Sequence, residues 1–443
     1  MELRQGYKNM EVGVIPEDWE VKKFQDVMEG FSSGQTPYRG RPEFYKGDIP
    51  WITSGELNYN VITDTIEKIT IEGAREANLK MIPKGTFLFA ITGLEAAGTR
   101  GSCAITGIEA TTNQSCMALY PKKGLLNTTY LFHYYVRYGD ELAFKYCQGT
   151  KQQSYTGGIA KKLPIIVPPT VAEQTVIATA LSDADALINN LEKLIAKKRN
   201  IKQGAMQKLL QPKEGWEEQS IFQIAENKKE LFDDGDWIES EHITDKGIRL
   251  IQTGNIGIGT FLEKENKKFI YEESFRKLGC KLLKVGDLLI CRLAEPAGRA
   301  CVFPYIGEDK VITSVDVTIY RPSRDVVNRE FLNQIFTTNN WFNLISELCG
   351  GTTHKRISRG ALGRIKIKLP DIEEQYEIAT ILSDMDAEIQ ALETKVEKYR
   401  NIKLGMMQNL LTGKIRLVKP QSIEQLCELP MAAEPTGNYS KIT

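Results

Sequence analysis

The sequence predicts an α+β protein in which two mixed α/β domains are joined by two long antiparallel coiled-coil helices, with an internal pseudo-two-fold repeat. The first observation is a duplication: 23 of the 38 positions in 173–210 are identical to the residue 201 positions later. Apolar residues also recur in both copies at alternating steps of four and three. A looser repeat of short apolar stretches precedes each copy. Together these observations predict the order domain, helix, domain, helix.

The apolar spacing makes each copy of the duplicated stretch a coiled-coil helix of roughly 40 residues. Thr170 stands three residues before Glu173, and Asp371 stands three before Glu374, as in a capping box. A single seam of this kind usually packs on its own domain, whereas two matched seams in one chain favour packing on each other. The predicted seam residues are Ile177, Leu181, Ala184, Ile188, Leu191 and Ile195 in the first copy, and Ile378, Leu382, Met385, Ile389, Leu392, Val396 and Tyr399 in the second.

Composition excludes several classes of protein. The 443 residues are enough for two or three domains, and no apolar run approaches the roughly 18 residues of a membrane span. Eight cysteines without a Cys-x-x-Cys pair and only three histidines argue against structural zinc and fit a reducing cytoplasm. The 57 basic and 57 acidic residues give a net charge of zero, which argues mildly against a free-standing nucleic-acid binder. We therefore expect a cytoplasmic chain without a metal site.

Charge is distributed less evenly than its total implies. No acidic residue lies between Glu141 and Glu173, or between Glu347 and Asp371. One such stretch is as easily a solvated face, but two at equivalent positions before the repeat helices favour phosphate contact. The basic residues in these stretches are Lys145, Lys151, Lys161, Lys162, Lys355, Arg356, Arg359, Arg364, Lys366 and Lys368.

The segments before the helices repeat in layout and diverge in their loops. The stretch 49–57 parallels 248–256, and 82–91 parallels 283–292; each is a short apolar strand next to a glycine. Divergence confined to loops predicts two related recognition surfaces with different targets. The predicted divisions are a first domain 1–167, a first helix 168–211, a second domain 212–368, a second helix 369–413 and a largely disordered tail 414–443.

The sequence carries none of the common catalytic motifs. There is no P-loop, no HExxH and no GxSxG. Pro168-Pro169 lacks the flanking residues of an adenine methyltransferase tetrad, and Gly254, Gly257 and Gly259 do not match a dinucleotide fingerprint. The sequence therefore predicts a protein without a catalytic site of its own.

The motifs IPEDWEVKK, EQTVIATALSDADALI, EEQYEIATILSDMDAEI, RNIKQGAMQKLL, RNIKLGMMQNLL and LLTGKIRL together identify a family resemblance. From about residue 15 to residue 417 the chain resembles the specificity subunit of type I restriction–modification systems, which restrict phage DNA. The resemblance implies two target-recognition domains, each of which reads one half of a split double-stranded DNA target. It also implies that the helices bind two modification (methyltransferase) subunits and that a restriction (translocase and nuclease) subunit joins them.

The resemblance further implies that the chain is not an enzyme and binds no cofactor. S-adenosylmethionine, ATP and magnesium would be bound by partner subunits. A helical spacer of fixed length suits half-sites about one DNA turn, near 34 Å, apart. The polar helix positions Lys197, Lys198, Arg199, Lys398 and Arg400 would face partner subunits, the DNA or solvent.

Base-reading residues are nominated by chemistry, because Arg and Lys pair with guanine while Asn and Gln pair with adenine. Taken singly, each of them is more often a phosphate contact or a solvated surface group than a base contact. In the first domain they are Gln35, Tyr38, Arg39, Arg41, Lys46, Arg100, Asn113, Gln114, Lys151, Gln152, Gln153 and Tyr155. In the second domain they are Thr253, Asn255, Arg292, Arg299, Thr313, Ser314, His354, Lys355, Arg356 and Arg359.

Two other functions remain open at the level of sequence. The chain would be a non-catalytic coiled-coil scaffold or dimerising protein-interaction module if the domains bound proteins rather than DNA. It would be a self-sufficient enzyme, such as a fused methyltransferase, if its cofactor motifs were unrecognisable.

Overall fold

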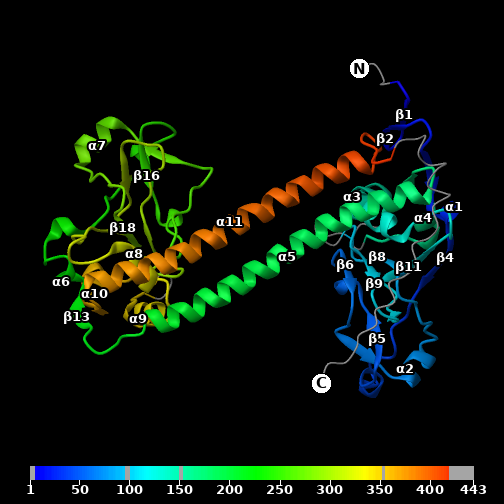
Figure 1. Ribbon diagram of the computed structural model, residues 1–443, viewed down its shortest axis with the longest axis horizontal. Helices are drawn as coiled ribbons and strands as arrows, with labels where there is room; N and C mark the ends of the chain where they lie inside the picture. Colours follow the sequence, from blue (N-terminus) through cyan, green and yellow to red (C-terminus); the bar gives the residue numbers. More distant parts are fainter. Residues whose placement is uncertain (1–4, 95–99, 149–152, 352–354, 419–443) are drawn as a thin grey trace, which may run out of the picture. The chain divides into compact units, whose positions relative to one another are not determined.

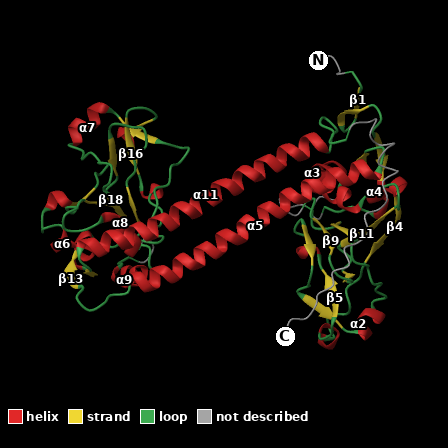
Figure 2. Ribbon diagram, in the orientation of Figure 1, coloured by secondary structure: helices red, strands yellow, loops and turns green. Residues whose placement is uncertain are grey.

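The computed structural model describes residues 5–94, 100–148, 153–351 and 355–418. The chain forms two compact units: unit 1 is Met1–Leu191 with Lys395–Thr443, and unit 2 is Glu192–Thr394. Each unit is a mixed sheet-and-helix domain that also holds one segment of each long helix (Figures 1 and 2). The units cut across the linear division read from the sequence, because each domain packs on both long helices. Most of the tail, residues 419–443, lies outside the described residues.

In its described residues, unit 1 is built on a five-stranded sheet of order β4-β11-β8-β9-β6 and a three-stranded sheet of order β10-β5-β7. All four residues of β8 are buried, which agrees with its uninterrupted apolar sequence Phe-Leu-Phe-Ala. The strands are β1 (Tyr7–Met10), β2 (Gly13–Pro16), β3 (Glu20–Lys23), β4 (Met28–Ser33), β5 (Ile49–Ile52), β6 (Asn60–Ile62), β7 (Glu67–Ile69), β8 (Phe87–Ala90), β9 (Cys103–Thr106), β10 (Thr111–Thr112), β11 (Cys116–Pro121) and β12 (Pro164–Val167).

Helix α3 (Thr128–Tyr146) covers the core of this domain. It begins at Asn127, whose side chain accepts a hydrogen bond from the Tyr130 amide. The buried rings of Tyr130 and Tyr135 pack in the same core as β8, and the Tyr130 hydroxyl donates to the Ile166 carbonyl at 2.9 Å. The other helices of this domain are short: α1 (Phe24–Val27), α2 (Ile71–Glu76) and α4 (Gly157–Lys162), with 3-10 turns η1 (Pro42–Tyr45) and η2 (Ser54–Glu56).

Unit 2 repeats the sheet plan. Its orders are β14-β21-β18-β19 and β15-β17-β16-β20, with β13 paired to β22 as β3 is to β12. The strands are β13 (Glu217–Ser220), β14 (Phe232–Asp234), β15 (Ile243–Thr244), β16 (Ile248–Ile251), β17 (Lys268–Ile270), β18 (Leu288–Cys291), β19 (Ala300–Val302), β20 (Val311–Thr313), β21 (Val317–Tyr320) and β22 (Lys366–Leu369). The short helices are α6 (Ile221–Ile224), α7 (Glu272–Leu278), α8 (Arg329–Ile335), α9 (Asn339–Leu348) and α10 (Arg359–Arg364), with 3-10 turns η3 (Lys229–Leu231), η4 (Ser240–His242) and η5 (Thr253–Asn255).

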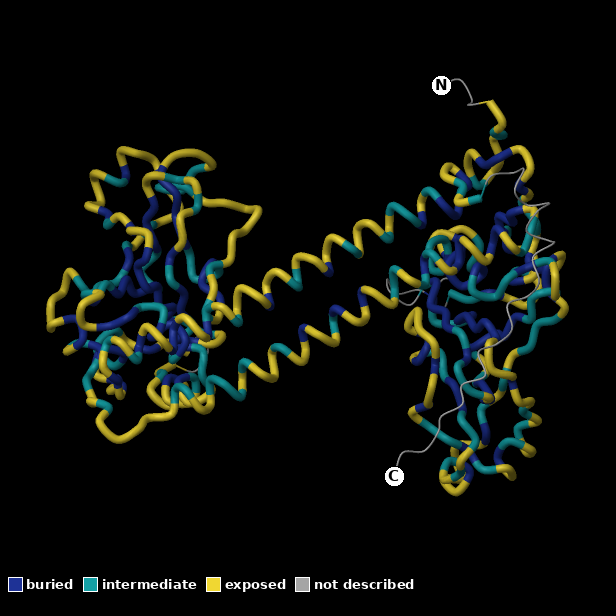
Figure 3. Tube along the Cα trace, viewed as in Figure 1, coloured by how far each residue is buried: buried dark blue, intermediate teal, exposed yellow. Residues whose placement is uncertain are grey.

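The duplicated stretch forms two helices of 39 residues each, α5 (Val171–Leu209) and α11 (Ile372–Leu410). The prediction of two long helices is confirmed. In each unit a segment of α5 lies beside a segment of α11 (Figure 1). Every predicted seam residue is buried or half-buried, and exposed positions alternate with buried ones along both helices (Figure 3).

The two helices are antiparallel within each unit. In unit 1, Leu181 near the start of α5 shares a core with Leu410 at the end of α11. In unit 2 the roles are reversed, since Leu382 of α11 lies in a core against which Leu209 of α5 packs. Each domain is therefore closed by the beginning of one long helix and the end of the other.

A buried glutamine docks the start of each long helix on its domain. The Gln174 side chain accepts a hydrogen bond from the Asn127 amide at 2.8 Å. The Gln375 side chain, 201 positions later, accepts one from the Asn328 amide at 2.9 Å. Gln375 also donates to the Pro370 carbonyl at 2.9 Å. These buried contacts give a physical reason for the glutamine shared by both copies.

Charged groups of α5 pair across to α11 in unit 2. Lys198 approaches Glu388 to 2.7 Å and Arg199 approaches Glu393 to 2.5 Å. These two basic residues, expected to face partners, DNA or solvent, therefore pair with the neighbouring helix. Both pairs are largely exposed, so each contributes little to stability.

The segment that follows α11 returns to the beginning of the chain within unit 1. The Arg416 guanidinium donates to both carboxylate oxygens of Glu173, each at 2.7 Å, and also to Asp18 at 2.8 Å. Burial raises the pKa of Glu173, and the Arg416 guanidinium opposes that rise. The Tyr7 hydroxyl donates to the Gly413 carbonyl at 3.0 Å. Both ends of the described chain thus complete the first domain.

Candidate nucleic-acid interface

The two domains share one backbone feature that supports a loop at the end of a sheet. After β4 the Gln35 amide donates to the Thr112 carbonyl at 3.1 Å, and after β14 the Asp236 amide donates to the Thr313 carbonyl at 2.8 Å. A Cβ atom at Gly34 would lie 1.6 Å from the Thr112 carbonyl oxygen. Glycine is therefore required there, and the side chains that follow it project from a fixed backbone.

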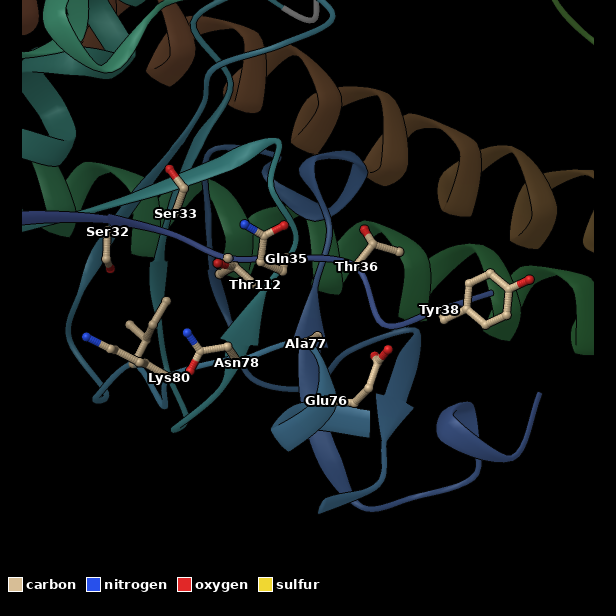
Figure 4. A pocket seen from close by; sticks show the side chains of 12 residues that line it. Ser32, Ser33, Gln35, Thr36, Tyr38, Glu76, Ala77, Asn78, Lys80 and Thr112 are labelled. Carbon is tan, nitrogen blue, oxygen red and sulfur yellow. The ribbon is translucent and has the colours of Figure 1, made fainter. Parts of the chain in front are cut away.

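In unit 1 this loop borders a polar groove with a volume of about 690 Å³ (Figure 4). Its walls come from the end of β4, the loop that follows, and the turn after α2. Two nominated residues, Gln35 and Tyr38, line it, and Tyr38 is 65% exposed. The complete lining is Ser32, Ser33, Gly34, Gln35, Thr36, Tyr38, Glu76, Ala77, Asn78, Lys80, Ile82 and Thr112.

The nominated Gln114 joins this loop and Arg39 lies further along it. The Thr36 hydroxyl donates to the Gln114 side-chain oxygen. Arg39 donates to both oxygens of Glu67, at 2.6 and 2.8 Å, and lies 4.2 Å from the centre of the Tyr45 ring. The hydrogen bond to Glu67 raises the pKa of Arg39. Arg39 is thus held against its own domain, although half of its side chain is exposed.

Four further nominees of the first domain differ in how they are held. Arg41 and Lys46 are exposed. Arg100 pairs with Asp140 at 3.3 Å, and the Asn113 side chain accepts from the Ser115 amide at 3.0 Å. Arg41 and Lys46 are therefore accessible in this structure, whereas Arg100 and Asn113 already have protein partners.

Tyr155 does not belong to the accessible surface. Its side chain is 3% exposed and its ring packs in the core, 5.9 Å from the Phe89 ring. Its nomination is corrected, because a side chain in the core cannot reach a base edge. Gln153 is half-buried, and Lys151 and Gln152 lie outside the described residues.

Several of the residues nominated in the second domain are buried and hydrogen-bonded to the domain's own backbone. Asn255 is 5% exposed; its side chain accepts from the Gln252 amide at 3.0 Å and donates to the Leu262 carbonyl at 2.9 Å. Thr313 is fully buried and its hydroxyl donates to the Ile251 carbonyl. Both nominations are corrected, because these side chains are buried and hydrogen-bonded to the domain's own backbone.

The two arginines at the ends of the connection between β18 and β19 also donate hydrogen bonds to the domain's own backbone. Arg292 is 3% exposed, donates to the Val315 carbonyl at 2.7 Å and pairs with Asp234 at 3.0 Å. Arg299 donates to the Ile256 carbonyl at 2.7 Å and to the Thr253 carbonyl at 3.0 Å. The nomination of Arg292 is corrected, because its side chain is buried. Arg299 is half-buried and is held by backbone carbonyls of its own domain. Thr253 and Ser314 are half-buried.

The remaining nominees of the second domain lie near its surface. Arg356 pairs with Asp316 at 2.9 Å with 42% of its side chain exposed. Arg359 pairs with Asp233, and Lys355 is exposed. His354 lies outside the described residues. Each of these two arginines is thus oriented by a carboxylate and partly accessible.

Nomination by residue chemistry missed three exposed side chains in or near these loops. Asn78 and Lys80 are exposed and line the groove of unit 1. Trp237, 68% exposed, follows Gly235 and Asp236 in the second domain. The signal was available in the sequence, because Gly235 stands 201 positions after Gly34, the same separation as in the helices.

Neither metal ligands nor a membrane span are found in the part of the chain that the structure describes. No group of three or more His, Cys, Asp or Glu side chains there could hold a metal ion. No helix among the same residues combines the length and apolar character that crossing a bilayer requires.

Two related domains with different surface loops, held on a duplicated pair of antiparallel helices, define a two-domain recognition protein. The family model of the type I restriction modification DNA specificity domain matches the chain twice, over residues 16–203 and 213–398. The chain belongs to this family, as the sequence resemblance predicted. It is a DNA specificity subunit, the non-catalytic component of a type I restriction–modification complex.

Relatives and solved structures agree with that assignment. The chain is 25% identical over 429 residues to the type I restriction enzyme MjaVIII specificity subunit of Methanocaldococcus jannaschii, covering 93% of this chain and 96% of that protein. It is 33% identical over 190 residues to the MjaIX specificity subunit of the same organism, covering 42% of each. The crystal structure of a type I restriction-modification S subunit from M. genitalium has the same fold, with a TM-score of 0.57, 14% identity and coverage of 93% of this chain and 98% of that one.

Proposed function

We propose that each domain reads one half of a split DNA target, so that the sequence read by the complex is the sum of two independent recognition events. The observation that carries this proposal is the pair of loops after Gly34 and Gly235. Their backbones are held by the same amide-to-carbonyl hydrogen bond, yet Gln35 and Thr36 occupy one loop where Asp236 and Trp237 occupy the other. Two loops whose backbones are held alike but which carry different side chains suit two domains that recognise different bases.

The accessible members of the nominated set are the proposed DNA contacts. In the second domain, Arg356 and Arg359 each have a carboxylate that orients the guanidinium and leaves part of it exposed. An oriented guanidinium can donate two hydrogen bonds to guanine or to a phosphate. The accessible nominees are Gln35, Tyr38, Arg39, Arg41, Lys46 and Gln114 in the first domain and Lys355, Arg356 and Arg359 in the second.

We further propose that the long helices bind two modification subunits, and that a restriction subunit joins this complex. Exposed apolar side chains on both helices support this proposal. Leu187, Leu194 and Ile201 of α5 stand seven residues apart and are 39%, 38% and 47% exposed. Ile381 and Ile402 of α11 are 44% and 43% exposed. Apolar side chains in a regular row suit packing against partner helices.

The cysteines and the proposed DNA target together bear on the compartment in which the chain works. The seven cysteines of the described residues are free thiols. Free thiols together with a DNA target fit the cytoplasm, where we place the chain.

One comparison tests these proposals. The chain is purified alone and with its methyltransferase subunit, and each preparation is footprinted on duplex DNA of random sequence. We expect a stable complex and a footprint of two protected segments that appears with the partner present. A chain that forms no complex with the methyltransferase subunit and protects no DNA would instead support a protein-interaction scaffold.

A further inference from the structure

The groove of the first domain has an equivalent position in the second domain, residue for residue. Ser32, Gln35 and Lys80 line the groove, and the residues 201 positions later are Asp233, Asp236 and Lys281. The backbones agree as well. Asn78 has a φ of 50° and its equivalent, Gly279, has a φ of 62°.

The hydrogen bonds around this position also correspond. The Ile82 amide donates to the Ala110 carbonyl at 2.7 Å, and the Leu283 amide donates to the Val311 carbonyl at 2.7 Å. The donor and the acceptor of the second hydrogen bond each lie 201 positions after those of the first. Differences between the two sites therefore come from side chains rather than from the course of the chain.

In the second domain the lysine is engaged by the domain's own carboxylates. The Lys281 ammonium lies 3.2 Å from Asp233 and 3.5 Å from Asp236. The Lys281 amide also donates to Asp236 at 2.8 Å, and Arg359 pairs with Asp233. A DNA base or phosphate approaching here would have to displace these contacts and would meet two carboxylates.

In the first domain the two carboxylates are replaced by a serine and a glutamine. Ser32 is hydrogen-bonded to the Tyr120 hydroxyl at 2.9 Å, and Lys80 and Asn78 are exposed. Lys80 and Asn78 lie beside one another at one end of the groove, whereas the single acidic lining residue, Glu76, lies apart from Lys80 toward Tyr38 (Figure 4). The groove thus offers two amides and an ammonium to a ligand.

We infer that Gln35, Asn78 and Lys80 form a base-reading site of the first domain, and that the equivalent site of the second domain is closed by its own ion pairs. The inference rests on the proposed reading of one half-site by each domain. Amide side chains pair with the donor and acceptor edge of adenine, and an ammonium pairs with the acceptor edge of guanine. The second domain reads its half-site with other groups, including the neighbouring Trp237.

The test uses the complete complex with methyltransferase subunits and a library of duplexes in which each half-site base is varied. Asn78→Gly introduces the residue that the second domain carries, so the left-handed backbone conformation is retained. Lys80→Gln removes the ammonium. Each variant should reduce discrimination roughly 5- to 150-fold at one position of the first half-site and leave the second half-site unchanged. Lys84→Gln, an exposed lysine outside the lining, serves as the matched control and should change neither.

A graft tests the closing of the site directly. Ser32→Asp combined with Gln35→Asp places carboxylates where the second domain has them, and should abolish preference at the same position while thermal unfolding and assembly with methyltransferase subunits are retained. Equal weakening on all sequences with a lower salt dependence would identify a phosphate contact and overturn the inference, as would unchanged discrimination. If the unmodified complex protects two segments, such results overturn this inference alone. If it shows no sequence preference, the proposed function falls with it.

Discussion

Lys202 of α5 and Asp386 of α11 form an ion pair with an Nζ–Oδ distance of 2.5 Å, and the residues 201 positions from each, Lys403 and Asp185, also form an ion pair. Lys202 and Lys403 continue the rows of apolar seam residues. Asp386 in addition accepts a hydrogen bond from Gln334 of α8 at 2.9 Å. Each pair therefore ties one long helix to the other and, in unit 2, to the domain. A charged residue within a seam favours one register over the alternatives.

Removing one member of this pair should cost more than removing both. Asp386→Ala leaves Lys202, only 15% exposed, without its partner. Because Asp386 itself is half exposed, we expect a loss of about 1–2 kcal/mol in the free energy of unfolding rather than the larger cost of a fully buried pair. Adding Lys202→Met should recover part of that loss, as measured by urea denaturation in a double-mutant cycle. Purely additive effects would show that the pair is not coupled.

The counterpart of Gln334 in unit 1 is His133, which predicts a pH dependence. His133 is 1% exposed, its Nε2 lies 2.9 Å from the Ser182 hydroxyl, and Asp185 and Lys403 face it. Burial lowers the pKa of His133 to about 4, with Asp185 opposing and Lys403 assisting that shift. Between pH 6.5 and 4 the unfolded chain binds this proton and the folded chain does not, so stability is full above pH 6.5 and falls as the pH drops.

The measurement is urea denaturation of the unmodified chain and of His133→Gln at pH 7 and pH 5. From the two pKa values, His133 should lower the free energy of unfolding by about 2 kcal/mol on going from pH 7 to pH 5. The variant should not show this part of the loss. Gln334 shows that a glutamine fits the equivalent position. Equal losses in both proteins would contradict a neutral buried His133.

The buried docking glutamine of α11 should be essential for stability. Gln375→Leu leaves the Asn328 amide and the Pro370 carbonyl without their side-chain partner in a site that is 2% exposed. Unsatisfied buried groups cost about 1–3 kcal/mol each, so we expect a loss of about 2–4 kcal/mol in thermal or urea denaturation. Gln390→Leu, on the exposed face of the same helix, is the control and should have little effect.

The loop after β4 should not tolerate a side chain at its first residue. Gly34→Ala forces a Cβ atom into the Thr112 carbonyl and should displace Gln35. We expect DNA binding to lose its preference at the first half-site while the second half-site is read normally. Gly157→Ala, where a Cβ atom meets nothing within 4 Å, should leave both preferences intact. Normal reading of both half-sites by Gly34→Ala would place the recognition site elsewhere.

The helices and their packing were predictable because the relevant information is local and appears twice. The seam from Ile177 to Ile195 shows its period without reference to any other segment. The match of each seam to a partner followed from the duplication. The polar partners of the helices, such as Gln174 with Asn127, were not predictable, because they depend on residues brought together only by folding.

The recognition residues were only partly predictable, because residue chemistry does not distinguish a base contact from an internal support. Asn255, Arg292 and Thr313 have suitable side chains but satisfy buried backbone groups. Asn78 and Lys80 follow a short helix and carry no motif of their own. The 201-residue offset, continued from the helices into the domains, would have identified both the closed site of the second domain and the exposed Trp237.

The reading of two half-sites by two domains can be tested by selecting bound duplexes from a random library, with the chain assembled with its methyltransferase subunits. We expect the enriched duplexes to share two specified segments separated by a spacer of constant length in which no base is preferred. A single uninterrupted segment, or enrichment of no sequence at all, would contradict the claim that the two domains read two halves of one target.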